Sequence, residues 1–126
     1  MACRITELVV DSRDPVRLAA FWCRVLGFVE LERVGGSVEI GPPDTGFGGP
    51  QPTLVFNPTS EPRRGKLPLH IDVSATDRDQ DSELDRLLAA GAVHADIGQS
   101  GEESWHVLAD PEGNEFCLLR NRVAPA

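Results

Sequence analysis

The stretch ITELVVDSRDPVRLAAFWCRVLG, residues 5–27, shows a strand followed by a helix. Apolar and polar residues alternate over Ile5–Asp11, as expected for a strand with one buried face. Asp14 and Pro15 then form a helix start signal, an N-cap carboxylate followed by proline at the first helical position. The apolar residues after them recur at helical intervals, and Gly27 closes the pattern as a left-handed C-terminal residue. This stretch therefore predicts a strand–helix unit.

The same plan occurs a second time in LHIDVSATDRDQDSELDRLLAAG, residues 69–91. An alternating segment leads through the polar stretch Thr76–Asp79 into a helical stripe of leucines, and Gly91 ends the helix. Glu7 and His70 hold equivalent positions of the two first strands, because Glu7 stands 20 residues before Gly27 and His70 stands 21 residues before Gly91. The chain therefore contains an internal repeat.

Each helix is followed by three strand-like segments, which are residues 28–33, 37–40 and 53–56 in the first half and residues 92–97, 105–108 and 115–119 in the second. The segment Asp110–Asn114, which reads DPEGN, is a strong hairpin signal between the last two. The Pro- and Gly-rich stretch Gly41–Pro52 predicts a long hairpin loop, either a lid over a site or a surface insertion. The sequence is thus interpreted as one domain, residues 1–126, made of halves 4–57 and 67–121 and linker 58–66.

Each half reads strand, helix and three strands, which predicts an α+β fold of two βαβββ modules. The alternation also predicts two different sheet faces. The apolar rows expected to pack under the helices are Leu8, Val10, Leu69, Ile71, Val73, Phe116 and Leu118. The opposite face, expected to line a cleft, carries Glu7, His70, Asp72, Glu115 and Cys117.

Composition narrows the class of protein further. Hydrophobic residues make up 40% of the chain and charged residues 25%, as in ordinary globular proteins. A formal net charge of −8 disfavours nucleic-acid and anionic-membrane partners. The N-terminus lacks the apolar run of a signal peptide, and no segment is apolar enough to span a bilayer. Three widely spaced cysteines suit a reducing compartment, so we expect a cytoplasmic protein.

Two phrases, FWCRVLGF at residues 21–28 and ADPEGNEFCLL at residues 109–119, occur within this repeated plan. With them the chain resembles the vicinal-oxygen-chelate superfamily of glyoxalases, bleomycin-resistance proteins and extradiol dioxygenases, and within it the short glyoxalase-like proteins. The resemblance covers Ile5–Arg120. It implies that the two modules form a cupped mixed sheet with helices on its outer face and a site in the hollow. It also implies a homodimer.

The resemblance implies metal-ligand positions: a His, Gln or Glu on the first strand of each half and a Glu near the end of each last strand. Glu7 and His70 fill the first-strand positions. In the second half the expected Glu position holds Cys117, while Glu115 stands two residues earlier, about 6.6 Å along the strand on the same face. The first half offers no ligand within Leu54–Phe56. A divalent metal on Glu7, His70 and either Glu115 or Cys117 is therefore one interpretation, and a metal-free cleft is the favoured one.

The polar face also predicts acid–base chemistry and a ligand pocket. His70 beside a carboxylate can exchange protons near neutral pH, so His70 and Glu7 are the candidate catalytic residues; a purely structural polar network is the alternative. The candidate pocket residues are Asp72, Glu115, Cys117 and Trp105. Trp105 suits stacking on a planar ligand, although the sequence does not assign its face. Cys117 is interpreted as a small wall residue rather than a nucleophile.

Three functions are compatible with this pattern. The first is an enzyme, a lyase or isomerase acting on a small oxygenated or aromatic metabolite. The second is a binding protein that sequesters a drug or metabolite without chemistry. The third is a structural or regulatory homologue with a vestigial cleft. The small-molecule ligand is the partner that the first two share, and the sequence does not identify it.

Overall fold

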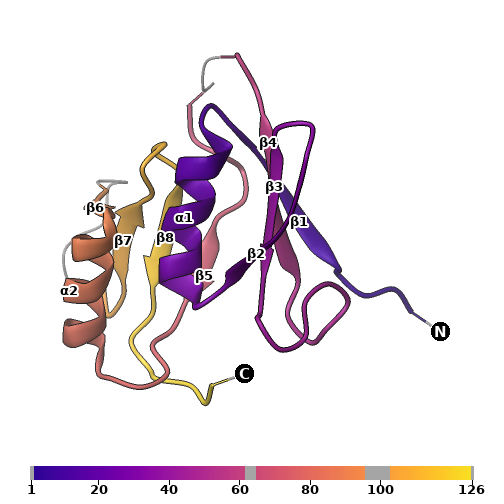
Figure 1. The fold of residues 1–126 in the computed structure, drawn as a ribbon. Helices are drawn as coiled ribbons and strands as arrows, with labels where there is room; N and C mark the ends of the chain where they lie inside the picture. The colour runs from indigo at the N-terminus through magenta and orange to yellow at the C-terminus, as the bar shows by residue number, and fades with distance from the viewer. Residues whose placement is uncertain (1, 62–64, 96–102, 126) are drawn as a thin grey trace. The chain divides into compact units, whose positions relative to one another are not determined.

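The structure is a computed structural model that describes residues 2–61, 65–95 and 103–125 (Figure 1). The chain divides into two compact units, one up to residue 62 and one from residue 63 to residue 125. Within the described residues, each unit contains one helix and one four-stranded sheet. The two units are described separately below.

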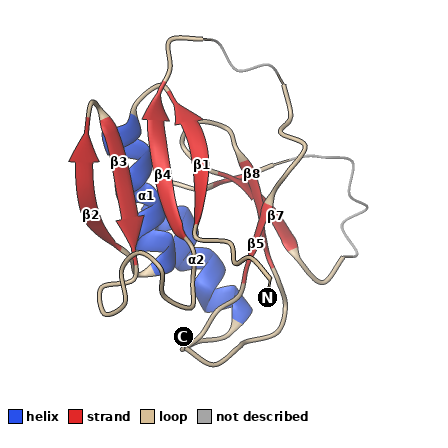
Figure 2. Cartoon of the chain, turned by 90° about the vertical axis from the view of Figure 1, so that its right-hand side faces the viewer, coloured by secondary structure: helices blue, strands red, loops and turns tan. Residues whose placement is uncertain are grey.

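The first unit holds five elements, which are β1 (Glu7–Ser12), α1 (Pro15–Leu26), β2 (Val29–Val34), β3 (Ser37–Gly41) and β4 (Thr53–Pro58). Its sheet has the order β1-β4-β3-β2, with β1 parallel to β4 and the other pairs antiparallel. Figure 2 shows these strands side by side with α1 behind them. The parallel β1–β4 pair is possible because α1 and the β2–β3 hairpin supply the long connection that parallel strands require.

Helix α1 begins and ends where its sequence signals predict. The Asp14 carboxylate accepts a hydrogen bond from the Arg17 backbone N–H at 3.2 Å, and Pro15 occupies the first helical turn. At the other end Gly27 takes the left-handed conformation, with φ 69°. The apolar stripe of α1 is buried against β3 and β4, and Leu18 has no exposed surface. Burial of each such large apolar side chain contributes about 1.5–3 kcal/mol.

The second unit repeats this plan with shorter strands, which are β5 (Ile71–Val73), α2 (Gln80–Ala90), β6 (Val93–His94), β7 (His106–Ala109) and β8 (Glu115–Leu118). Its sheet has the order β5-β8-β7-β6, the counterpart of the first sheet, with β5 parallel to β8. The Asp79 carboxylate caps α2 by accepting from the Ser82 backbone N–H at 2.8 Å. The two sheets confirm the predicted α+β fold of two βαβββ modules.

The turn between β7 and β8 is organised by one buried carboxylate. Asp110 is 3% exposed and accepts hydrogen bonds from the backbone N–H groups of Glu112 and Asn114, both at 2.9 Å. The Asn114 side-chain amide donates to its second oxygen at 3.0 Å. Gly113 has φ 84°, a conformation in which glycine is favoured. The hairpin predicted from the DPEGN phrase therefore forms, and it fixes the register of β8 against β7.

Three sequence expectations need correction or lie partly outside the described residues. Leu69, expected in an apolar row under a helix, is 64% exposed because β5 begins only at Ile71. The last residues of the predicted strand 92–97 and the middle of the predicted linker 58–66 fall outside the described part of the chain. The loop Gly41–Pro52 connects two antiparallel neighbours, β3 and β4, as predicted. Neither helix in the described residues is long and apolar enough to cross a membrane.

Candidate functional site

Strand pairing in the second sheet places several predicted site residues on one face. Asp72 on β5 is the register partner of Cys117 on β8, and Cys117 is in turn the partner of Val107 on β7. Glu115 pairs with Ala109 and points to the same side as Cys117, because alternate residues of a strand share a face. We call this surface, which carries Asp72, Glu115, Cys117, Val107 and Ala109, the Cys117 face.

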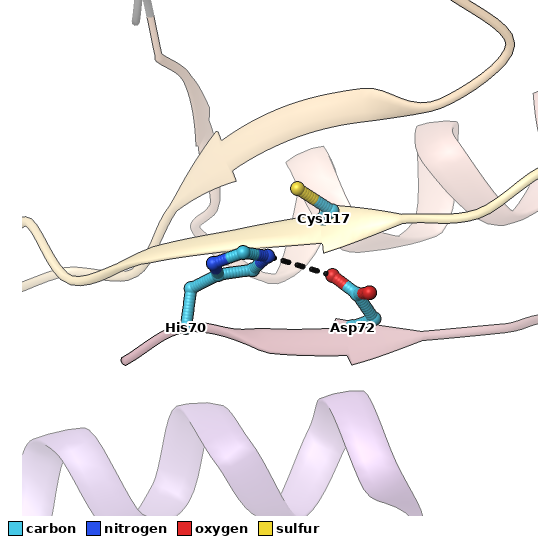
Figure 3. Close-up of side chains that lie close together, drawn as sticks. All are labelled: His70, Asp72 and Cys117. Atoms are coloured by element: carbon cyan, nitrogen blue, oxygen red, sulfur yellow. Dashed lines mark ion pairs between the residues drawn. The ribbon is translucent and has the colours of Figure 1, made fainter. Parts of the chain in front are cut away.

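Three side chains come together on the Cys117 face (Figure 3). His70 Nε2 lies 3.1 Å from Asp72 Oδ1, and one potential ligand atom from each of His70, Asp72 and Cys117 lies within 4.8 Å of the other two. The His70 and Asp72 side chains are 54% and 47% exposed, whereas Cys117 is buried. The thiol of the cluster is thus buried, whereas the imidazole and the carboxylate are accessible to solvent.

The surroundings of Cys117 keep its thiol protonated. Burial raises its pKa, and the nearby negative charges of Asp72 and Glu115 raise it further, as does a hydrogen bond with Asp72. The positive charge of Lys66 acts in the opposite direction and is the smallest contribution. A thiol in this state is a poor nucleophile, which agrees with the interpretation of Cys117 as a wall residue.

Glu115 lies on the same face but has a separate partner. One of its carboxylate oxygens, Oε2, is buried and accepts no hydrogen bond from the described residues. The Lys66 ammonium group lies 3.7 Å from that oxygen, close enough for an ion pair but not for a hydrogen bond. Glu115 therefore brings a poorly satisfied negative charge beside the cluster.

Trp105 lies one residue before β7 and is 42% exposed. It stands two residues before Val107, and the pairing of Val107 with Cys117 places Val107 on the Cys117 face. The alternation therefore indicates that Trp105 borders this face, which the sequence alone did not settle. His106 has the other parity and pairs with Leu118 on the opposite face, where its ring also contacts that of His94.

Glu7 lies in the first unit, on a face of its own sheet that also carries Thr53, its register partner on β4. The Thr53 hydroxyl, which is buried, donates to Glu39 Oε2 at 2.7 Å. Glu39 is thus a second carboxylate on the face that carries Glu7. The predicted roles of Glu7 as catalytic residue and metal ligand, together with His70, stay predictions.

The alternation of the sequence predicted His70 and Asp72 on one face, and the structure brings their side chains together. The alternation did not predict Glu39, because the pairing of β3 with β4 is not visible from the local pattern. Of the predicted metal ligands, which were Glu7, His70 and either Glu115 or Cys117, the cluster contains His70 and Cys117.

The two βαβββ modules define the architectural class of this protein, and sequence comparison identifies its family. The glyoxalase-like domain model matches residues 7–119, so the chain belongs to the glyoxalase-like domain family. This confirms the resemblance noted above. A search of curated proteins found no match to the chain.

Solved structures agree in fold. A glyoxalase/bleomycin resistance protein/dioxygenase family enzyme from Burkholderia phytofirmans PsJN is 22% identical, with a TM-score of 0.68 over 92% of this chain and 97% of that one. The fosfomycin resistance protein FosX from Listeria monocytogenes, complexed with Mn(II) and sulfate, is 13% identical with a TM-score of 0.70, over 98% and 94% of the two chains. TioX from Micromonospora sp. ML1 is 22% identical with a TM-score of 0.56, over 94% and 98%. At these identities the likeness concerns the fold alone.

Proposed function

We propose that this protein binds a small oxygenated or aromatic metabolite on the Cys117 face and acts on it as a lyase or isomerase. The observation that carries the proposal is the juxtaposition of His70 and Asp72, 3.1 Å apart and about half exposed. An open imidazole–carboxylate pair offers both a hydrogen-bond donor and a proton acceptor to a ligand oxygen. Trp105 at the border of the face supplies apolar surface on which a planar ligand can stack.

In the proposed reaction His70 and Asp72 have distinct roles. With Asp72 accepting a hydrogen bond from Nε2–H, the His70 lone pair lies on Nδ1. In that tautomer Nδ1 takes a proton from a ligand hydroxyl or from a carbon next to a carbonyl, and Asp72 stabilises the resulting imidazolium. Return of the proton to another ligand atom completes an isomerisation, and loss of a leaving group completes an elimination. Glu7 remains the predicted second group for this chemistry.

A divalent metal is common in this superfamily, and the residues present fit one. Imidazole nitrogen, carboxylate oxygen and thiolate sulfur are all ligands for divalent transition metals, and one of each meets at His70, Asp72 and Cys117. A bound ion would supply Lewis-acid polarisation of a ligand oxygen.

One observation favours sequestration without chemistry as a second candidate. The last strand of the first half, β4, carries Leu54, Val55 and Phe56 where metal-dependent relatives are expected to carry a glutamate. A protein that lacks this carboxylate can still hold a ligand in the hollow. Ligand binding without turnover of any compound in the screen below would select this candidate.

The test is a ligand screen on protein treated with a chelator. Small 2-oxo and 2-hydroxy carboxylates, catechols and fosfomycin are added separately, and the melting temperature and heat of binding are measured. A bound ligand raises the melting temperature, because it stabilises only the folded state. We expect His70→Ala to weaken binding of the hit by about tenfold or more, the size of a lost charge-assisted hydrogen bond.

His94→Ala is the matched control, because His94 lies on the opposite face of the same sheet, as the partner of Leu108. It should leave binding unchanged. Binding that is lost in His94→Ala but kept in His70→Ala would place the ligand elsewhere and contradict the proposal. Product analysis of the same mixtures separates catalysis from sequestration.

We further propose that the protein is a cytoplasmic homodimer. The cytoplasmic part of this proposal rests on the three free cysteines of the described residues, because a reducing compartment keeps thiols unpaired. Sedimentation velocity at micromolar concentration tests the dimer, for which a single species of the monomer mass would be contrary evidence.

A further inference from the structure

The donor atoms of His70, Asp72 and Cys117 form a compact group of three different chemical types. They come from two neighbouring strands of a single module, with Asp72 and Cys117 directly opposite each other in the ladder. A parallel ladder holds such partners at fixed spacing, so the carboxylate and thiol are positioned by the backbone itself. His70 stands just before β5, two residues before Asp72. Its side chain lies on the same side of the strand and reaches toward the Asp72 carboxylate (Figure 3).

We infer that His70, Asp72 and Cys117 form a binding site for a thiophilic divalent ion of the zinc class, complete within the second module. The inference goes beyond the proposed function, because it specifies a thiophilic ion held by residues of the second module alone and gives Glu7 no part in holding the ion. It rests on the proposed function only in placing the metal on the same sheet face as the small-molecule ligand.

The separations suit such an ion after small side-chain rotations. In a tetrahedral zinc site with bonds of about 2.0–2.3 Å, the ligand atoms lie roughly 3.3–3.8 Å apart. His70 Nε2 and Asp72 Oδ1 are already 3.1 Å apart, and the widest separation in the group is at most 4.8 Å. The half-exposed His70 and Asp72 side chains can rotate toward the buried sulfur. Three protein ligands leave a fourth position open, as in catalytic zinc sites.

The charge around the site also favours a cation. Asp72 and Glu115 both act on the Cys117 sulfur with negative charge, and one Glu115 oxygen is buried beside the cluster without a hydrogen bond from the described residues. A divalent ion would compensate these charges and bind the sulfur as thiolate. The thiolate makes the site selective, because sulfur ligands favour zinc and cobalt over manganese and magnesium.

Cobalt(II) titration of chelator-treated protein tests the inference directly. Cobalt occupies zinc sites, and a thiolate ligand gives it an intense charge-transfer band in the near ultraviolet. We expect one equivalent of cobalt to produce this band, zinc to remove it by competition, and manganese to bind at least tenfold more weakly. No band at one equivalent, or manganese binding as tight as cobalt, would overturn the inference.

Variants identify the ligands. Cys117→Ser should abolish the band, and Asp72→Asn and His70→Ala should each weaken cobalt binding at least tenfold. Cys23→Ser is the matched thiol control and should keep the band, because Cys23 lies on α1 of the first unit. Circular dichroism verifies that each variant folds. If Cys117→Ser fails to fold, the exposed His70 provides an independent variant.

Glu7→Gln tests whether Glu7 is one of the metal ligands. Cobalt affinity unchanged in Glu7→Gln agrees with a site complete within the second module, and a tenfold loss contradicts it. The screen on metal-free protein is independent of these results. Failure of the cobalt test, together with ligand binding that is weakened by His70→Ala, removes the metal site alone. An intact cobalt band, together with ligand binding that His70→Ala leaves unchanged, removes the proposed function alone.

Discussion

Cys117 shows how a strand neighbour can change the chemistry of a residue. In an apolar wall it would be an inert small side chain, but here its ladder partner is Asp72, and Glu115 stands on the same face. Burial and these two negative charges together raise the pKa of the thiol. The same surroundings that suppress its nucleophilicity in the metal-free protein make it a suitable ligand for a cation.

Thiol alkylation tests this description of the three cysteines. At neutral pH iodoacetamide should modify exposed Cys3 first and Cys117 roughly tenfold or more slowly, because only the thiolate reacts and Cys117 is both buried and kept protonated. Raising the pH should accelerate the modification of Cys117, because its raised pKa means that the thiolate forms only at a pH above that at which an ordinary thiol ionises. Mass spectrometry of the peptides after timed exposure gives the rates. Equal rates for Cys3 and Cys117 at neutral pH would contradict the description.

Asp110 provides a second residue-scale prediction. Its buried carboxylate accepts two backbone hydrogen bonds and one from the Asn114 amide. Asp110→Ala leaves these donors without their acceptor, so we expect the free energy of unfolding to fall by about 2–3 kcal/mol. Urea denaturation measures it. Asp44→Ala in the exposed loop is the control, with an expected change within about 0.5 kcal/mol. Equal effects of the two variants would show that the Asp110 network adds no stability.

At the residue scale, the sequence predicted on which face of the second sheet each side chain lies better than it predicted which side chains contact one another. His70, Asp72, Glu115 and Cys117 were all expected on one face from their alternation, and the ladder places Asp72, Glu115 and Cys117 together. Which of them touch depends on strand register, which one strand's pattern does not contain. For the same reason the hydrogen bond between Thr53 and Glu39 could not be predicted.

At the element scale, α1 was predicted to the residue because its signals are local. An N-cap, a proline, an apolar stripe and a terminal glycine each act within one turn of the helix. Strand β5 was predicted too long, because its length depends on pairing with β8, which covers only Ile71–Val73. Leu69 lies beyond that ladder and is exposed.

Gly27 tests the helix-terminus argument. It has φ 69°, and a Cβ added there would meet no atom within 4 Å. The cost of Gly27→Ala is therefore that of the backbone conformation alone, about 1–2 kcal/mol. Gly27→Asn should cost less, because asparagine tolerates the left-handed region. Thermal and urea unfolding of both variants measure the difference. Alanine as stable as glycine at this position would contradict the assignment of the helix end.

At the scale of the whole molecule, the internal repeat made the fold predictable. The same order of strand, helix and three strands occurs twice, and the two sheets have corresponding strand orders. Function was less predictable, because the departures from the family pattern fall at the ligand positions. Cys117 stands where relatives are expected to carry glutamate, and we infer that this replacement changes which ion the site would prefer.

The two tryptophans report separately on the molecule. Trp22 is buried in α1, and Trp105 is 42% exposed at the border of the Cys117 face. A ligand on that face should change the fluorescence of Trp105 and leave that of Trp22 unchanged. Trp105→Phe should remove the ligand-dependent signal, whereas Trp22→Phe should keep it. A signal that persists in Trp105→Phe would place the ligand away from this face.

The central claim is that the small-molecule site lies on the Cys117 face around His70. Nuclear magnetic resonance of isotope-labelled, chelator-treated protein with the compound found in the screen tests it most directly, because the chain has only three histidines, whose rings serve as separate reporters. We predict that the His70 ring and the amides of Ile71–Val73 and Glu115–Leu118 shift, while the His94 and His106 rings do not. Shifts at His94 and His106 with an unchanged His70 ring would contradict the claim.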